Sequence, residues 1–248
     1  MRSRTRRAPQ AVLPTKTLRE EIAVVLFLSL LASAVYAIIS YTQAPLKGVT
    51  IHSVPQVSFP TQLANVVFGL APVWLVVYLV RRDGEGLGAI GLGTDGLARD
   101  AGRGVVLFAL AAVAGIGIYL TAVALGVNRF VVPVPPLGHW WTVPVLVLTA
   151  IEAALVEEVI VVGYLITRLQ QLGSTAAAAV GASALLRGTY HLYQGWGGFA
   201  GNLALGVFFG AVFVRTRRTW PLVVAHLLLD VGAGVGYLLF REHLPGFG

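Results

Sequence analysis

The sequence contains no cysteine among its 248 residues. This absence excludes disulfide bonds, thiol nucleophiles and cysteine-ligated metal centres, and it leaves the cellular compartment open. Charged side chains are also scarce, at 12% of the residues, whereas a soluble globular domain usually carries about 25%. Hydrophobic residues make up 56% of the chain. They form long uncharged runs, which are typical of a protein that crosses a membrane several times.

The membrane restricts the choice of fold, because backbone polar groups in lipid must be satisfied within helices or a closed barrel. The apolar runs are too long and continuous for barrel strands. We therefore predict an all-α fold, a polytopic transmembrane helical bundle with about seven membrane helices. Residues 1–21 are expected to form a basic cytoplasmic tail, and residues 22–248 a single membrane domain. The expected spans are Ile22–Tyr41, Leu63–Val80, Val105–Leu125, Val143–Ile166, Ser174–Leu192, Phe199–Val214 and Leu222–Phe240.

Basic residues are distributed unevenly between the connections. The N-terminal tail and the second, fourth and sixth connections hold most of them, whereas the odd connections hold only Lys47 and Arg129. Lys and Arg are enriched on the cytoplasmic side of membranes, which predicts a cytoplasmic N-terminus and an external C-terminus in the plasma (inner) membrane. The net charge of +7 is explained by this topology, so we expect a lipid bilayer and no nucleic acid as a partner.

Two glycine patterns occur in the sequence. Gly86, Gly88 and Gly91 match G-x-G-x-x-G, but a dinucleotide site requires a preceding strand in a βαβ unit, and here a membrane helix precedes the pattern. Gly206 and Gly210 form a G-x-x-x-G pattern that favours close helix packing.

Ionisable residues at membrane depth carry the strongest functional signal, because each costs several kcal/mol in a bilayer core. Span four contributes two adjacent acids, and spans five and seven each contribute a pair four residues apart that shares one helix face. We expect them to line one pocket, with one acid facing the cavity and the other bracing a neighbouring helix. A purely structural ion pair stays open as the alternative. These residues are Glu157, Glu158, Arg187, His191, His226 and Asp230.

Three segments carry a family resemblance: EEVIVVGYL from 157, RGTYHLYQG from 187 and HLLLD from 226. In order and spacing they resemble the E-E-x-x-x-R, F-x-x-x-H and H-x-x-x-N motifs of the CPBP family, the CAAX-protease and bacteriocin-processing membrane proteins. The similarity covers residues 143–240. The resemblance implies an intramembrane endopeptidase that acts on a peptide or membrane-protein substrate.

The resemblance also implies roles for individual residues. Glu157 would activate water with support from Glu158, and His191 would hold that water. His226 and residue 230 would stabilise the oxyanion.

Three positions depart from the family motifs. Val162 replaces an Arg, Arg187 replaces a Phe, and Asp230 replaces an Asn. The first two look like one exchange of a guanidinium between helices. Asp230 must be protonated, pair with Arg187 or bind something positive. The resemblance favours a mechanism without a cofactor, but a zinc ion held by His191, His226 and Asp230 stays open.

Two other functions fit the buried acids. A non-catalytic relative, acting as a membrane scaffold or chaperone, would keep the pocket without the activity. A proton-coupled transporter would use Glu157, Glu158 and Asp230, although the broken inverted repeats of many transporters are not evident.

Overall fold

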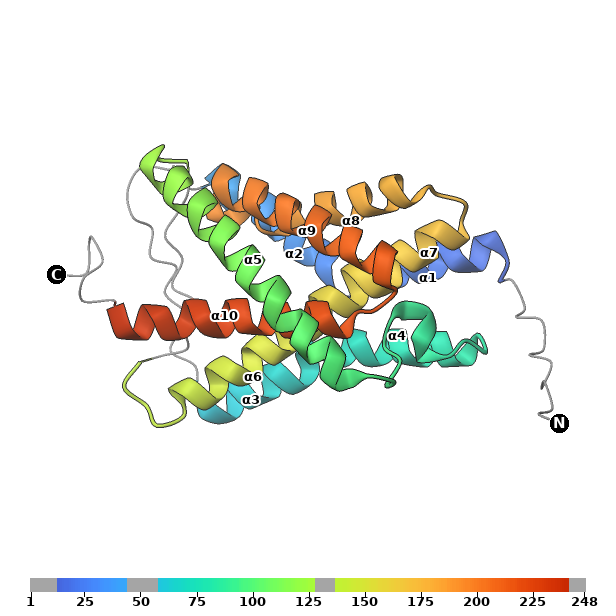
Figure 1. Ribbon diagram of the computed structural model, residues 1–248, viewed down its shortest axis with the longest axis horizontal. Helices are drawn as coiled ribbons and strands as arrows, with labels where there is room; N and C mark the ends of the chain where they lie inside the picture. The colour runs from blue at the N-terminus through green and yellow to red at the C-terminus, as the bar shows by residue number, and fades with distance from the viewer. Residues whose placement is uncertain (1–12, 44–57, 128–136, 241–248) are drawn as a thin grey trace.

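The computed structural model describes residues 13–43, 58–127 and 137–240, and helices make up nearly all of this part of the chain (Figure 1). No strand occurs within these ranges, so the predicted all-α bundle is confirmed. Residues 1–12 of the predicted tail lie outside the described residues.

The α-helices are α1 (Thr15–Phe27), α2 (Leu30–Gln43), α3 (Phe59–Gly69), α4 (Ala71–Arg82), α5 (Leu97–Ala124), α6 (Thr142–Leu155), α7 (Leu165–Gln171), α8 (Ala176–Tyr190), α9 (Trp196–Thr216) and α10 (Trp220–Phe240). Three further segments are η1 (Leu87–Ile90) and η3 (Leu192–Gln194), both 3₁₀-helices, and η2 (Val156–Tyr164), a π-helix.

Four helical segments are long and apolar enough to cross a membrane by themselves: Phe59–Arg82, Leu97–Tyr119, Trp196–Thr216 and Trp220–Phe240. The bent pair α1–α2 makes a fifth candidate if it is one span. The expected count of seven is therefore not confirmed by length and composition. Large apolar side chains cover the outside of the bundle, as a lipid-facing surface requires. The chain is an integral membrane protein.

One candidate span is sharply bent near its middle, and a second is locally interrupted there. Helices α1 and α2 meet at an angle of 51°, where the Ser29 hydroxyl donates a hydrogen bond to the carbonyl of Val25 (2.6 Å). Helices α3 and α4 are separated at Leu70, and Pro72 lies in the first turn of α4, where its missing N–H costs no helical hydrogen bond. The breaks interrupt two otherwise apolar helices and, as described below, both border the same cavity.

The basic connections gather at one end of the bundle. The connections α4–α5, α7–α8 and α9–α10 lie toward the end where α1 begins, at the right of Figure 1. Arg168 is fully buried there, and its guanidinium contacts Asp83 (2.9 Å) and Glu85 (3.0 Å), while Arg82 pairs with Glu21. These pairs hold the ends of α1, α4 and α7 together.

The first helix begins at Thr15, although the sequence predicted a tail up to residue 21 and a span from Ile22. The polar residue Glu21 is buried in the network just described, within 3.5 Å of the Tyr164 hydroxyl. Because ion pairs satisfy Glu21, the helix extends past the apolar segment. The helix therefore begins within the segment assigned to the tail, and the boundary of the membrane domain at residue 22 stays a prediction.

Both glycine patterns are packing features. A Cβ on Gly206 would lie 2.8 Å from the Cα of Ala184, and one on Gly210 would lie 2.9 Å from Val180, so these glycines let α9 approach α8. The G-x-G-x-x-G segment forms η1 between α4 and α5, with Gly91 at φ +79°. Helix α4, and not a strand, precedes this segment, so it lacks the βαβ context that a dinucleotide site requires.

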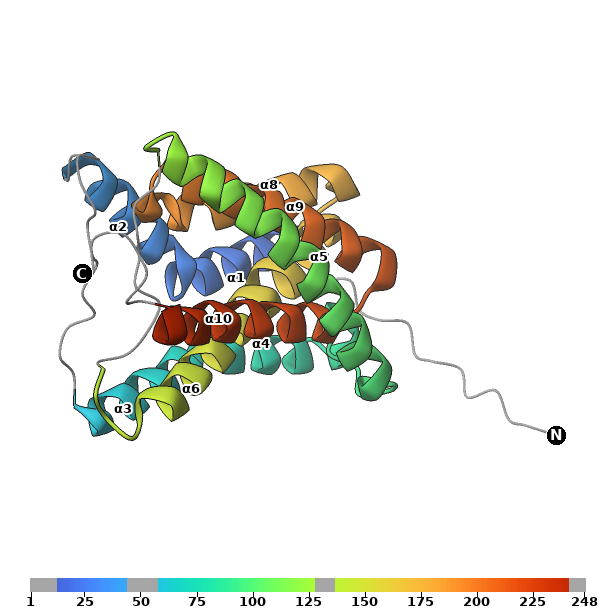
Figure 2. The ribbon, with the colours of Figure 1, turned by 60° about the vertical axis from the view of Figure 1, so that its left-hand side comes forward.

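The π-helix η2 lies at the centre of the bundle. Helices α6, η2 and α7 form one continuous helical path, and η2 contacts α4, α8, α9 and α10. Helix α10 packs against α5 on one side and α6 on the other, as Figures 1 and 2 both show. This arrangement directs polar residues of η2, α8 and α10 toward one another.

Candidate functional site

Charged side chains from three helices meet at η2. The Arg187 guanidinium reaches from α8, placing Nη1 2.6 Å from Glu158 Oε1 and Nη2 3.3 Å from Glu157 Oε2. His226 reaches from α10, and its Nδ1 lies 2.8 Å from Glu158 Oε1. The two adjacent acids therefore find their partners on other helices, as the sequence predicted. The four residues form one cluster.

The π-helical geometry of η2 accounts for the way both acids reach one guanidinium. A π-helix bonds i to i+5, and π-helical turns inserted in α-helices are frequent at functional sites. Its wider turn rotates adjacent residues by less than the 100° of an α-helix, so Glu157 and Glu158 can both contact Arg187. Sequence reasoning assumed an α-helix here and missed this feature.

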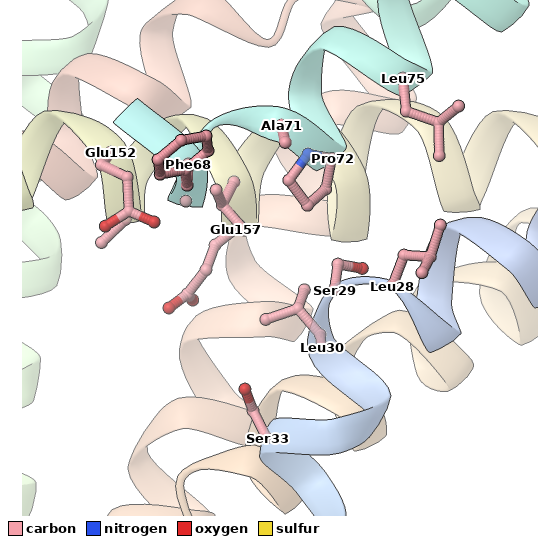
Figure 3. Close-up of a pocket in the computed structure, with 13 residues that line it drawn as sticks. Leu28, Ser29, Leu30, Ser33, Phe68, Ala71, Pro72, Leu75, Glu152 and Glu157 are labelled. Atoms are coloured by element: carbon pink, nitrogen blue, oxygen red, sulfur yellow. The ribbon is translucent and has the colours of Figure 1, made fainter. Parts of the chain in front are cut away.

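The two acids differ in exposure, as expected. Glu158 is fully buried, with its Oε1 shared between Arg187 and His226, whereas the Glu157 side chain is 13% exposed. Glu157 lines a cavity of about 670 Å³. Figure 3 shows its carboxylate projecting into this space, opposite Leu30 and Ser33. One acid thus faces the cavity while the other braces the neighbouring helices.

His226 joins Asp230 to the cluster. The His226 Nε2 lies 3.5 Å from Asp230 Oδ2, while its Nδ1 bonds Glu158. The Arg187 Nη2 also lies 3.3 Å from His226 Nδ1, so this nitrogen faces both a carboxylate and a guanidinium. Asp230 is more exposed than His226, with 40% of its side chain accessible to solvent. Arg187 pairs with Glu158 and Glu157, and among the described residues it forms no ion pair with Asp230. The pairing of Asp230 with Arg187 that the sequence left open is therefore not observed.

His191 occupies a different position from the other predicted site residues. It follows the last residue of α8, and its Nδ1 donates a hydrogen bond to the Arg187 carbonyl (3.0 Å). This bond fixes the proton on Nδ1 and leaves Nε2 as the second functional nitrogen when the ring is neutral. The structure shows no direct bond from His191 to Glu157 or His226 within the described residues. His191 thus adjoins the cluster through the backbone of Arg187.

Tyr190 is a site residue that the sequence analysis missed. Its hydroxyl donates to Glu157 Oε2 at 2.7 Å, the same oxygen that Arg187 contacts. The motif RGTYHLYQG contained this tyrosine, but tyrosines are common at membrane interfaces, so its presence gave no distinct signal.

The structure brings together a different set of possible metal ligands from the one predicted. Ligand atoms of Glu157, Glu158 and His226 all lie within 4.8 Å of one another, and His191 and Asp230 are not part of this group. Arg187 contacts all three of these residues. Its guanidinium therefore already supplies positive charge at this point and would repel a metal cation, so this set fits a metal poorly.

The cluster coincides with a recognisable sequence segment. Residues 139–232 match the family model described as type II CAAX prenyl endopeptidase Rce1-like. This segment is similar to the Rce1-like family. The resemblance to CPBP proteases proposed from the sequence is confirmed by this match. Comparisons with curated proteins and with solved structures gave no match.

The Rce1-like segment contains every residue of the cluster and extends from the connection before α6 to the middle of α10. Two motif departures within it are spatially related. Val162 is fully buried and packs in the same apolar cluster as Phe209, and the Arg187 guanidinium lies 5.6 Å from the centre of the Phe209 ring. Val162, which replaces the arginine of the motif, and Arg187, which replaces its phenylalanine, therefore both lie near Phe209 on α9.

Proposed function

We propose that this protein is an intramembrane endopeptidase that hydrolyses a peptide bond of a membrane-associated substrate with water activated by Glu157. The observation that carries the proposal is the state of the Glu157 carboxylate. Tyr190 and Arg187 both hold its Oε2, whereas Oε1 has no hydrogen-bond partner among the described residues. A carboxylate fixed through one oxygen and free at the other, on a cavity wall, suits a general base. The similarity of residues 139–232 to a prenyl endopeptidase family supports the same reaction class.

The proposed reaction requires two proton transfers. Water gives a proton to Glu157 Oε1 as its oxygen bonds to the carbonyl carbon of the substrate. The tetrahedral intermediate then collapses, the C–N bond breaks, and Glu157 returns the proton to the leaving amine. The products are a carboxylate and an amine.

The neighbouring residues have separate roles in this proposal. Glu158 positions Arg187 and His226 by accepting a hydrogen bond from each (2.6 and 2.8 Å). His191 holds the water through its Nε2, since its Nδ1 is bound to a carbonyl. His226, protonated between Glu158 and Asp230, supplies positive charge toward the oxyanion.

The substitution Glu157→Gln tests the base directly, because glutamine keeps the shape and removes the proton acceptor. We expect cleavage of an apolar peptide library in proteoliposomes to fall by about 10²–10⁴-fold, with thermal unfolding unchanged. Glu20→Gln is the matched control, since Glu20 lies on α1, outside the cluster, and its side chain is 64% exposed. Unchanged cleavage by Glu157→Gln would refute the proposal. If the wild type cleaves nothing and Glu157→Gln keeps its cellular function, the protein is a scaffold.

A second measurement addresses zinc. In the proposed mechanism Arg187 supplies the positive charge at the acids, so a chelator should leave cleavage unchanged. Near-stoichiometric zinc in the purified protein, with reversible loss of activity on chelation, would establish a metal-dependent enzyme instead.

A further inference from the structure

Glu152 is an acid on the cavity wall that the proposed chemistry does not use. It lies on α6, five residues before Glu157, and both residues line the cavity of about 670 Å³. Figure 3 shows both carboxylates projecting from the same helical path into this space. The cavity therefore holds two carboxylates that face the same occupant.

The two carboxylates differ in their partners. Glu157 is bound by Tyr190 and Arg187, whereas no hydrogen bond or ion pair joins Glu152 to any of the described residues. A charged group without a partner beside an apolar wall is costly. Glu152 is only partly buried, so its carboxylate is accessible to an occupant of the cavity that could pair with it.

The wall around Glu152 leaves room for its carboxylate. A Cβ on Gly69, at the break between α3 and α4, would lie 2.8 Å from the carboxylate carbon of Glu152. The other lining residues near it are mostly apolar, including Phe68 and Val156. The cavity thus offers, besides Glu157, a second carboxylate without a partner that is set in a mostly apolar surface.

We infer that Glu152 determines substrate specificity by binding the cationic side chain of a lysine or arginine in an otherwise apolar peptide. This inference rests on the proposed function. A basic side chain would neutralise the carboxylate, and the apolar wall would accept its neighbours. Five helical residues separate Glu152 from Glu157 by about 7.5 Å along the axis. An extended peptide advances about 3.3–3.6 Å per residue, so the basic residue lies about two residues from the scissile bond.

The test uses binding, so that it does not depend on catalysis. Photo-crosslinkable apolar peptides that differ only in one residue, lysine, norleucine or glutamate, are titrated against the Glu157→Gln variant in nanodiscs. We expect the lysine peptide to bind about 10- to 100-fold more tightly than the norleucine peptide. Adding Glu152→Gln should reduce this ratio to about one, and adding Glu152→Lys should make the glutamate peptide the preferred one.

A second variant changes the position of the carboxylate without changing its charge. Gly69→Ala should displace Glu152 and lower the lysine preference. Gly115→Ala is the matched control, because a Cβ there meets nothing within 4 Å. The control should keep the preference.

The outcomes separate this inference from the proposed function. Equal binding of the lysine and norleucine peptides, a preference that survives Glu152→Gln, or no binding of any peptide overturns the role of Glu152. Full cleavage by Glu157→Gln overturns the peptidase mechanism instead, and the binding ratio still decides the role of Glu152.

Discussion

Replacing Arg187 by phenylalanine, the residue of the family motif, should destabilise the protein strongly. The Arg187 side chain is 1% exposed and is paired with Glu158, which is fully buried, and with Glu157, which is 13% exposed. Removing one partner of a buried pair costs about 3–5 kcal/mol, because the remaining charge stays buried and unpaired. Solvent does not screen the bond to Glu158, so we expect a loss of unfolding free energy within this range.

The exchange of arginine between helices can be tested in the same experiment. If Val162 and Arg187 mark one exchange, adding Val162→Arg to Arg187→Phe should recover part of the lost stability. The spacing supports this, because Val162 follows Glu157 by five residues within a π-helix, whose bonds join i and i+5.

The assay is denaturant unfolding of the purified protein in detergent micelles. Arg99→Phe serves as the control, since Arg99 is exposed in the first turn of α5 and pairs with none of the described acids. A double variant no more stable than Arg187→Phe would refute the exchange, and an Arg187→Phe protein as stable as the control would refute the importance of the buried pair.

Two further predictions concern packing and orientation. Gly163→Ala should lower the unfolding free energy by about 1–3 kcal/mol, because its Cβ would lie 2.7 Å from the Ile90 carbonyl and 2.9 Å from Thr219 Oγ1; the control Gly181→Ala meets nothing within 4 Å, so equal effects of the two changes would contradict the packing argument. Reporter fusions should place the N-terminus in the cytoplasm and the C-terminus outside, because the basic connections lie at the end where α1 begins; an active cytoplasmic reporter at the C-terminus would contradict the predicted orientation.

The helical fold and the polar cluster were predictable because each depends on a simple rule. Long apolar runs in lipid must be helical, and buried charges must find partners. The rule for buried charges was sufficient to bring Glu157, Glu158, Arg187 and His226 together from separate motifs. Their direct contacts follow from the cost of leaving any of them unpaired. Of these four residues, however, Glu157 alone lines the cavity of about 670 Å³, so the expectation of one cavity lined by all of them stays a prediction.

Other features depend on tertiary packing and could not be predicted. The hydrogen-bond register that makes η2 a π-helix is not encoded in hydrophobic periodicity, which was compatible with an α-helix. The cavity wall is formed by the breaks at Ser29 and Leu70, and these apolar segments carry no charge that would mark them as part of a site. The open position of Glu152 follows from Gly69 on another helix.

The substitution of asparagine by aspartate at position 230 has a consequence for the proposed mechanism. An asparagine amide can donate a hydrogen bond to an oxyanion, whereas an ionised aspartate repels it. In this protein Asp230 lies beside His226, whose other nitrogen is bound to Glu158. Asp230 thus places a carboxylate near Nε2 of an imidazole whose Nδ1 faces both Glu158 and the Arg187 guanidinium. The altered motif therefore lacks the neutral donor, and in the proposed mechanism the positive charge toward the oxyanion comes from Arg187 and His226.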